Sequence, residues 1–162
     1  MSLLEIKKAG DPVLKQKCVE ITKITKKTKK LLDDMAETMY ANDGVGIAAP
    51  QIGKSIRAIV VDVNKKRYDI LNPVIIYREG SAVDTEGCLS CPDIYGEVER
   101  AEKIVLQYLT RYGKIKELEA EGLLARCIQH ETDHLDGRLF IDIAQNIREE
   151  KNHKKRGADS VK

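Results

Sequence analysis

The stretch that decides the fold is 122-GLLARCIQHETDHLDG-137, which contains the pattern His-Glu-x-x-His. Apolar residues recur in it at helical spacing and a glycine follows, so the sequence predicts a helix from about residue 122 to residue 135. Residues four apart on a helix share a face, and His130 and His134 can therefore direct two imidazoles at one cation. Glu131 is better placed to handle the protons of a metal-activated water than to act as a third ligand.

Length and charge limit the classes of protein that this chain can belong to. Its 162 residues suffice for one domain that buries a core without disulfides, and we expect a single metallohydrolase domain over residues 1–146. Residues 147–162 are charged and short of apolar anchors, which predicts a tail that is a fraying helix or disordered. The net charge of +2 is too small to indicate a nucleic-acid partner. No apolar run approaches the ~18 residues of a membrane span. No signal peptide is evident, and we therefore interpret the four cysteines as thiols or ligands in a reducing compartment.

Outside the His-Glu-x-x-His helix, the sequence predicts one further helix and several strands. Leucines and methionines at helical spacing predict a helix from about residue 25 to residue 40, whose lysine-rich first half we interpret as a solvated face. A β-branched run predicts a strand at 57–63, and short strands are expected at 68–71 and 74–77. Residues 103–110 are expected as a further strand, with 115–120 as its hairpin partner. We therefore expect an α+β fold, with antiparallel strands packed around the central His-Glu-x-x-His helix.

Two histidines supply only half of a tetrahedral site, so a further ligand must come from elsewhere in the chain. Cys88 and Cys91 form a C-x-x-C pair, and with the histidines they could make a closed structural zinc site. One cysteine with two histidines leaves a position for water, and Glu131 has a purpose only in such an open catalytic site, which we favour. Spacing alone does not choose among Cys88, which follows a glycine, Cys91, which precedes a proline, and Cys127 in the helix itself.

Three segments resemble, in order, the signature motifs of peptide deformylases: GVGIAAPQIG at 44–53, EGCLS at 86–90 and QHETDHLDG at 129–137. The likeness extends to GDPVL, RAEK and GLLARCIQH and covers roughly residues 10–142. Three ordered motifs are far more specific than His-Glu-x-x-His alone. Ile47 stands where the family often has leucine, and Cys91 stands where an apolar residue usually precedes the proline, which brings oxidation of Cys88 with Cys91 into question.

The resemblance implies a ligand set and three catalytic groups. The implied metal ligands are Cys88, His130 and His134. Glu131 is implied as the general acid and base that serves the attacking water and the departing amine. Gln51 and the backbone N–H of Leu89 are implied as donors to the oxyanion, because two neutral donors stabilise that charge without competing for the metal.

The resemblance also implies substrate contacts and a pair of bracing residues. The implied substrate-binding residues are Val45, Gly46, Ile47, Gly87, Leu123 and Cys127. The larger apolar side chains would line a pocket for methionine, and the glycines would let a peptide backbone approach. Glu86 and Arg100 resemble a pair that braces the metal-cysteine segment, the alternative being a surface ion pair. We interpret Asp133 and Asp136 as acceptors that orient the histidines, the equal alternative for Asp136 being a surface residue at the end of the helix.

The implied function is removal of the N-formyl group from the formylmethionine that begins nascent polypeptides, with release of formate. The implied metal is Fe2+, and Zn2+, Ni2+ or Co2+ would suit the same ligands. We expect a cytoplasmic, bacterial-type monomer that acts on N-formylmethionyl peptides and has no membrane or specific nucleic-acid partner. Lys151, Lys154, Lys155 and Arg156 suggest a transient contact with the ribosome.

Two other interpretations belong to different classes of protein. A metallopeptidase would need a His or Glu ligand downstream of the helix, where the nearest candidates are Asp142, Glu149 and His153 in a poorly anchored region. A non-enzymatic zinc module would need four closed ligands and metal-dependent folding, and it would be indifferent to Glu131→Gln.

Overall fold

The structure is a computed structural model that describes residues 3–150. Its helices are α1 (Lys26–Ala41) and α2 (Gly122–Leu135), with short 3-10 turns η1 (Pro12–Lys15), η2 (Ala49–Ile52) and η3 (Phe140–Asp142). Its strands are β1 (Gly46–Ala48), β2 (Ala58–Val63), β3 (Lys66–Glu79), β4 (Ala82–Cys88), β5 (Cys91–Arg100), β6 (Lys103–Leu109), β7 (Ile115–Glu121) and β8 (Gln145–Glu149). Within residues 3–150, no helix is long and apolar enough to cross a membrane.

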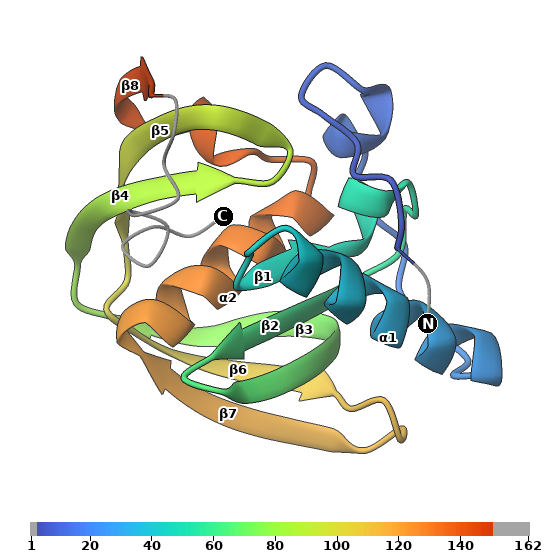
Figure 1. The fold of residues 1–162 in the computed structure, drawn as a ribbon. Helices are drawn as coiled ribbons and strands as arrows, with labels where there is room; N and C mark the ends of the chain where they lie inside the picture. The colour runs from blue at the N-terminus through green and yellow to red at the C-terminus, as the bar shows by residue number, and fades with distance from the viewer. Residues whose placement is uncertain (1–2, 151–162) are drawn as a thin grey trace.

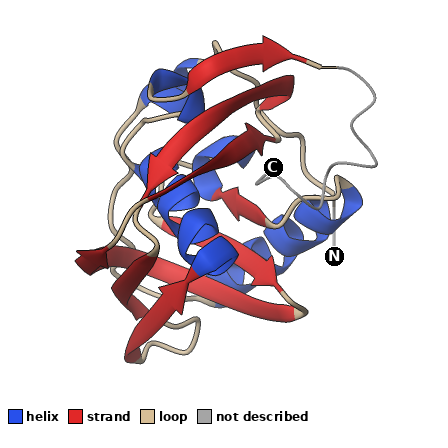
Figure 2. Ribbon diagram, turned by 90° about the vertical axis from the view of Figure 1, so that its left-hand side faces the viewer, coloured by secondary structure: helices blue, strands red, loops and turns tan. Residues whose placement is uncertain are grey.

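The strands form two sheets with α2 between them, as Figures 1 and 2 show from two sides. The larger sheet has the order β1-β2-β3-β6-β7, and the smaller has the order β4-β5-β8. Neighbouring strands in both sheets are antiparallel. The prediction of an α+β fold built from antiparallel strands around the His-Glu-x-x-His helix is therefore confirmed.

The larger sheet is covered by a helix on each face. Successive side chains of a strand point to opposite faces of the sheet, and the side chains of β2 point alternately toward α2 and toward α1. Ile59 and Val61 belong to the buried cluster that includes Ile128 of α2, whereas Ala58 and Val60 belong to the cluster of α1. Because burial of such apolar surface is the main stabilising contribution to folding, α2 is fixed on the sheet by its apolar side and presents its polar residues away from it.

Strand β3 differs from the prediction of two short strands at 68–71 and 74–77. It is one strand with a register shift between Leu71 and Val74, where Asn72 has a positive φ of 49°. The Asn72 side chain accepts a hydrogen bond from the Ile21 N–H and donates one to the Ile21 carbonyl, both at 2.8 Å. The Asn-Pro pair therefore marks a β-bulge, which bends a strand without ending it.

Strand β8 crosses the predicted boundary between domain and tail at residues 146 and 147. It pairs with β5 at the edge of the smaller sheet, with Tyr95 opposite Arg148. The expectation of a fraying helix or disordered chain is wrong for residues up to Glu149, because pairing with a distant strand holds a segment whose own side chains are mostly exposed. The four basic residues suggested as a ribosome contact lie outside the described residues.

Gly137 ends α2 in a conformation that only glycine adopts without strain, and this makes it a site of predicted instability. Its φ is 77°, and an added Cβ would lie 2.4 Å from the backbone oxygen of Lys15. We expect Gly137→Ala to lower the free energy of unfolding by more than the roughly 1–3 kcal/mol of left-handed strain alone. Urea unfolding followed by circular dichroism measures this change.

Gly122, at the other end of α2, is the matched control for this variant. Its φ is 62°, but an added Cβ would meet nothing within 4 Å. Gly122→Ala should therefore show the left-handed strain without the backbone clash. Equal losses in the two variants would contradict the close approach of Gly137 to Lys15.

Candidate metal centre

Three side chains from two elements converge between the sheets. Cys88 ends β4, and His130 and His134 lie one turn apart on α2. One potential ligand atom from each lies within 4.8 Å of the others, and all three residues are buried. Sγ of Cys88 is 3.3 Å from Nε2 of His134. One thiolate and two imidazoles form a donor set that suits several divalent transition metals.

Unpartnered polar atoms around this point show that the residues fit a cation. Within residues 3–150, Nε2 of His130 and both carboxylate oxygens of Glu131 are buried without a hydrogen-bond partner. The Glu131 oxygens lie 4.0 Å from Nε2 of His130 and 4.0 Å from Nε2 of His134. Buried polar groups are costly to leave unpaired, and a divalent ion with its water would satisfy all of these atoms.

Burial controls the protonation of the groups in this cluster. It raises the pKa of the Glu131 carboxyl to about 7, partly offset by His130. It lowers the pKa of His134, and the neighbouring His130 lowers it further. A neutral His134 can act as a ligand, since coordination requires an unprotonated nitrogen.

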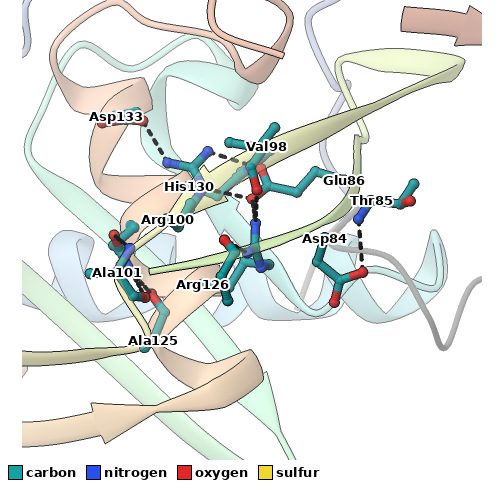
Figure 3. A network of polar contacts seen from close by, with 12 residues as sticks. Asp84, Thr85, Glu86, Val98, Arg100, Ala101, Ala125, Arg126, His130 and Asp133 are labelled. Carbon is teal, nitrogen blue, oxygen red and sulfur yellow. Dashed lines mark hydrogen bonds and ion pairs between the residues drawn. The ribbon is translucent and has the colours of Figure 1, made fainter. Parts of the chain in front are cut away.

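Glu86 is the buried acceptor that orients His130, as Figure 3 shows. Its Oε1 lies 2.8 Å from Nδ1 of His130, and Arg100 donates to the two Glu86 oxygens over 2.6 and 2.9 Å. Burial opposes the charged form of Glu86, but the hydrogen bonds from Arg100 and His130 prevail and hold its pKa far below the ordinary range. The Glu86–Arg100 pair is thus buried, and the alternative of a surface ion pair is wrong.

The interpretation that Asp133 and Asp136 orient the histidines is wrong. Asp133 accepts from Nη1 of Arg100 at 2.9 Å, and Asp136 accepts from Nη1 of Arg57 at 3.1 Å. The hydrogen bonds of these two carboxylates therefore go to arginines, although both aspartates are close to His134 in the sequence.

Gln51 is fully buried in η2 and directs its amide at the cysteine segment. Its Oε1 accepts from the Ala48 N–H at 2.9 Å, which fixes the orientation of the side chain. Its Nε2 donates to Sγ of Cys88 at 3.5 Å and to Oγ of Ser90 at 3.2 Å. Leu89 lies in the tight turn between Cys88 and Ser90, the two residues that the Gln51 amide contacts.

Cys91 lies directly across the hairpin from Cys88, and both are free buried thiols. The contact with Cys91, together with burial, raises the pKa of the Cys88 thiol. Oxidation of this pair to a disulfide stays a prediction. Cys127 lies elsewhere, on α2, where its thiol donates to the Val45 carbonyl at 3.5 Å.

The remaining predicted substrate contacts fall into two groups. Val45, Gly46 and Cys127 lie together beside Glu131, and Gly87 is buried in β4 next to the cysteine ligand. Ile47 packs in the cluster of α1, so its side chain is on the other face of the sheet from α2. Leu123, which the resemblance implies as part of the methionine pocket, is 39% exposed at the start of α2.

Gly46 of β1 lies close against helix α2, and its replacement should reduce activity. An added Cβ would lie 2.6 Å from Oε2 of Glu131 and 2.7 Å from Sγ of Cys127. We expect Gly46→Ala to displace the Glu131 carboxylate and to lower kcat/KM by up to about 100-fold, because a displacement of about 1 Å can have that effect. Steady-state kinetics at matched metal content measures it.

Gly44, two residues before Gly46, provides the control for Gly46→Ala. A Cβ at Gly44 would come nearest to the Leu89 side-chain end, at 3.0 Å, which can move aside. Gly44→Ala should therefore have the smaller effect. Unchanged kcat/KM in Gly46→Ala would show that Glu131 does not depend on this contact.

Two residues of the site were not found from the sequence. Arg126 is buried on α2 and donates to Glu86, and Ser90 is fully buried and accepts from Gln51. The available signal for Arg126 was its position four residues before His130, which places both on one helical face. Ser90 gave no signal beyond its membership in the EGCLS segment.

Known proteins share both the sequence and the fold of this chain. The family model for polypeptide deformylase matches residues 3–150. A peptide deformylase from Carboxydothermus hydrogenoformans is 52% identical over 147 residues, which are 91% of this chain and 97% of that protein. One from Pelotomaculum thermopropionicum is 53% identical over 148 residues, covering 91% and 96%.

Solved structures agree with the sequence comparisons. The peptide deformylase of Thermotoga maritima has a TM-score of 0.88 at 42% identity and covers 90% of this chain and 99% of that one. The Synechococcus elongatus enzyme, solved in complex with actinonin, has a TM-score of 0.86 at 41% identity, covering 88% and 79%. With its motifs in order, its cluster of cysteine and histidines, and this similarity along nearly its whole length, the chain belongs to the polypeptide deformylase family.

Proposed function

We propose that this chain hydrolyses the N-formyl group of N-terminal formylmethionine in nascent polypeptides and releases formate. The observation that carries the proposal is the buried triad of Cys88, His130 and His134 with the unpartnered Glu131 carboxylate beside it. Such an arrangement is typical of an open catalytic metal site, which keeps one position for the reacting water. A closed structural site would leave Glu131 without a purpose.

Each step of the hydrolysis has a residue suited to it. Cys88, His130 and His134 would hold a divalent ion, which would supply the Lewis acidity that makes hydroxide available near neutral pH. Glu131 accepts a proton as water adds to the formyl carbon, and it delivers a proton to the nitrogen as the C–N bond breaks. The products are formate and the free α-amino group. Gln51 Nε2 and the Leu89 N–H donate to the oxygen that gains negative charge, where preorganised donors act most strongly.

The methionine side chain is proposed to bind beside Val45 and Cys127. These residues contact each other and adjoin Glu131 through Gly46, so an apolar group there would lie next to the proton-transferring carboxylate. Leu123 lies four residues before Cys127 on the same helical face and would form the outer wall, consistent with its partial exposure.

Metal identity and cellular context are further parts of the proposal. We propose Fe2+ as the working ion, with Zn2+, Ni2+ and Co2+ as substitutes, since a thiolate with two imidazoles accommodates each of them. We also propose that the protein acts as a monomer in a cytoplasm, or in an organelle, where synthesis begins with formylmethionine. A contact of the basic C-terminal residues with the ribosome stays a prediction.

The test is formate release by protein purified without oxygen, with its metal content measured. Formyl-Met-Ala-Ser is the substrate, and acetyl-Met-Ala-Ser and unformylated Met-Ala-Ser are the comparison peptides. We expect about one metal per chain and rapid formate release, with little reaction of the acetyl peptide and no cleavage between Met and Ala. Cleavage of the peptide bond would instead support the metallopeptidase interpretation. Bound metal without any hydrolysis would support a structural site.

A further inference from the structure

The guanidinium of Arg126 joins helix α2 to both strands of the β4–β5 hairpin. Arg126 is 6% exposed. Its Nη1 donates to Oε2 of Glu86 at 2.7 Å and to the Val98 carbonyl at 2.9 Å, and its Nη2 donates to the Ala82 carbonyl at 2.9 Å. Ala82 and Glu86 belong to β4 and Val98 belongs to β5, so one planar group contacts both strands of the hairpin that ends in the cysteine ligand (Figure 3).

Arg126 makes the first of three contacts with the hairpin that recur every four residues along α2, in addition to the contact of Asp133 with Arg100. The contacts are Arg126 with Ala82 and Val98, His130 with Glu86 at 2.8 Å, and His134 with Cys88 at 3.3 Å. Residues at i, i+4 and i+8 share a helical face. Four helical residues, the spacing of His130 and His134, rise about 6 Å, and two strand residues, the spacing of Glu86 and Cys88, rise about 6.6 Å. The similar spacings let each histidine contact one residue of the strand. The helix and the hairpin are therefore in register, with Arg126 at one end and the metal ligands at the other.

The contact with Glu86 alone does not explain why an arginine is here. Arg100 already binds both oxygens of Glu86 and supplies a counter-charge. What Arg126 adds is the pair of bonds to two backbone carbonyls, one on each strand. A rigid planar fork can hold three acceptors in fixed directions, whereas the flexible ammonium of lysine cannot reproduce that geometry.

We propose that Arg126 is a positioning residue of the metal centre, which fixes the β4–β5 hairpin against α2 and thereby sets the separation of the Cys88 thiolate from the two histidines. This role rests on the metal site proposed above. It is distinct from a contribution to stability, because the register of two elements can change the ligand geometry in a protein that stays folded. Residues that orient metal ligands typically alter metal affinity by about 10–100-fold when replaced.

The test compares metal affinity in the full-length parent, Arg126→Met and Arg126→Lys, each shown to be folded by circular dichroism. Cobalt-loaded protein is titrated with a chelator of known affinity, and the cobalt–thiolate absorption bands are recorded. The control is Arg111→Met. Arg111 also forms an ion-pair network, with Asp33 at 2.7 Å and Asp69 at 2.9 Å, but that network lies at the α1 side of the larger sheet. Its loss should lower stability without affecting the metal.

We expect Arg126→Met to bind Co2+ about 10–100-fold more weakly and to shift the thiolate bands, with Arg126→Lys between it and the parent. Parent-like affinity and spectra in the folded Arg126 variants would overturn the proposal, and a loss of stability alone would leave Arg126 a structural residue. If Arg126→Met does not fold, parent-like cobalt binding by Arg126→Lys overturns it in the same way. A parent that binds no cobalt through a thiolate would instead contradict the metal site itself.

Discussion

Replacing Glu131 with glutamine is expected to reduce formate release by about 10²–10⁴-fold while the metal stays bound, the range over which a positioned acid–base group contributes. The glutamine keeps the size of the side chain and removes its ability to accept and return a proton. Cys88, His130 and His134 are unchanged, so the ligand set persists. The measurement is kcat/KM for formyl-Met-Ala-Ser with metal content determined on the same sample.

Glu121→Gln is the matched control for this prediction. Glu121 precedes α2 and is exposed, and the same chemical change there should leave both kcat and metal content as in the parent. Substantial turnover by metal-loaded Glu131→Gln would remove Glu131 from the mechanism. Loss of metal in that variant would instead make Glu131 a part of the ligand set.

Replacing Glu86 with glutamine should have the largest effect on stability, a loss of about 3–5 kcal/mol in the free energy of unfolding. The Glu86 side chain is fully buried and faces Arg100, Arg126 and His130. A neutral amide leaves the two buried guanidinium groups of Arg100 and Arg126 without their shared counter-charge, and it no longer offers His130 a carboxylate. We expect metal binding to weaken by about 10–100-fold as well.

Urea unfolding of metal-free protein isolates the stability effect of Glu86→Gln from the effect of metal binding. Asp69→Asn is the comparison, because Asp69 also pairs with two arginines but lies in the network of α1 and β3. Asp69→Asn should lower stability less, since that network is more exposed, and it should not change metal affinity. Equal midpoints for Glu86→Gln and the parent would contradict the assigned role of Glu86.

The parts of the fold that could be predicted from the sequence are those determined by local pattern. Helix α2 has the predicted ends because its apolar spacing and its terminal glycine are both local signals. The continuity of β3 could not be predicted, because the side chain that holds its bulge binds Ile21, 51 residues away. Strand β8 could not be predicted for the same reason. Its hydrogen bonds to the distant strand β5 hold it in place, and its own sequence has no apolar pattern that indicates a strand.

The site shows the same division between local and distant signals. The histidine pair and Glu131 follow from one helix, and the choice of Cys88 came only from the resemblance to a family. Arg126 was missed because its partners Glu86 and Ala82 are 40 and 44 residues away along the chain. Asp133 was assigned to the histidines because it is near them in sequence, whereas its partner is Arg100, 33 residues away.

The position of α2 near the end of the described chain has a consequence for the order of events during synthesis. Ile59, Ile70, Ile104 and Leu106 on the larger sheet are fully buried, in the cluster that this helix completes. Until residues 122–135 have emerged from the translating ribosome, that face of the sheet has no cover, and Cys88 has no histidine beside it. Growing chains that expose apolar surface in this way are prone to aggregate, so the addition of α2 covers this face of the sheet and brings both histidines to Cys88 in one event.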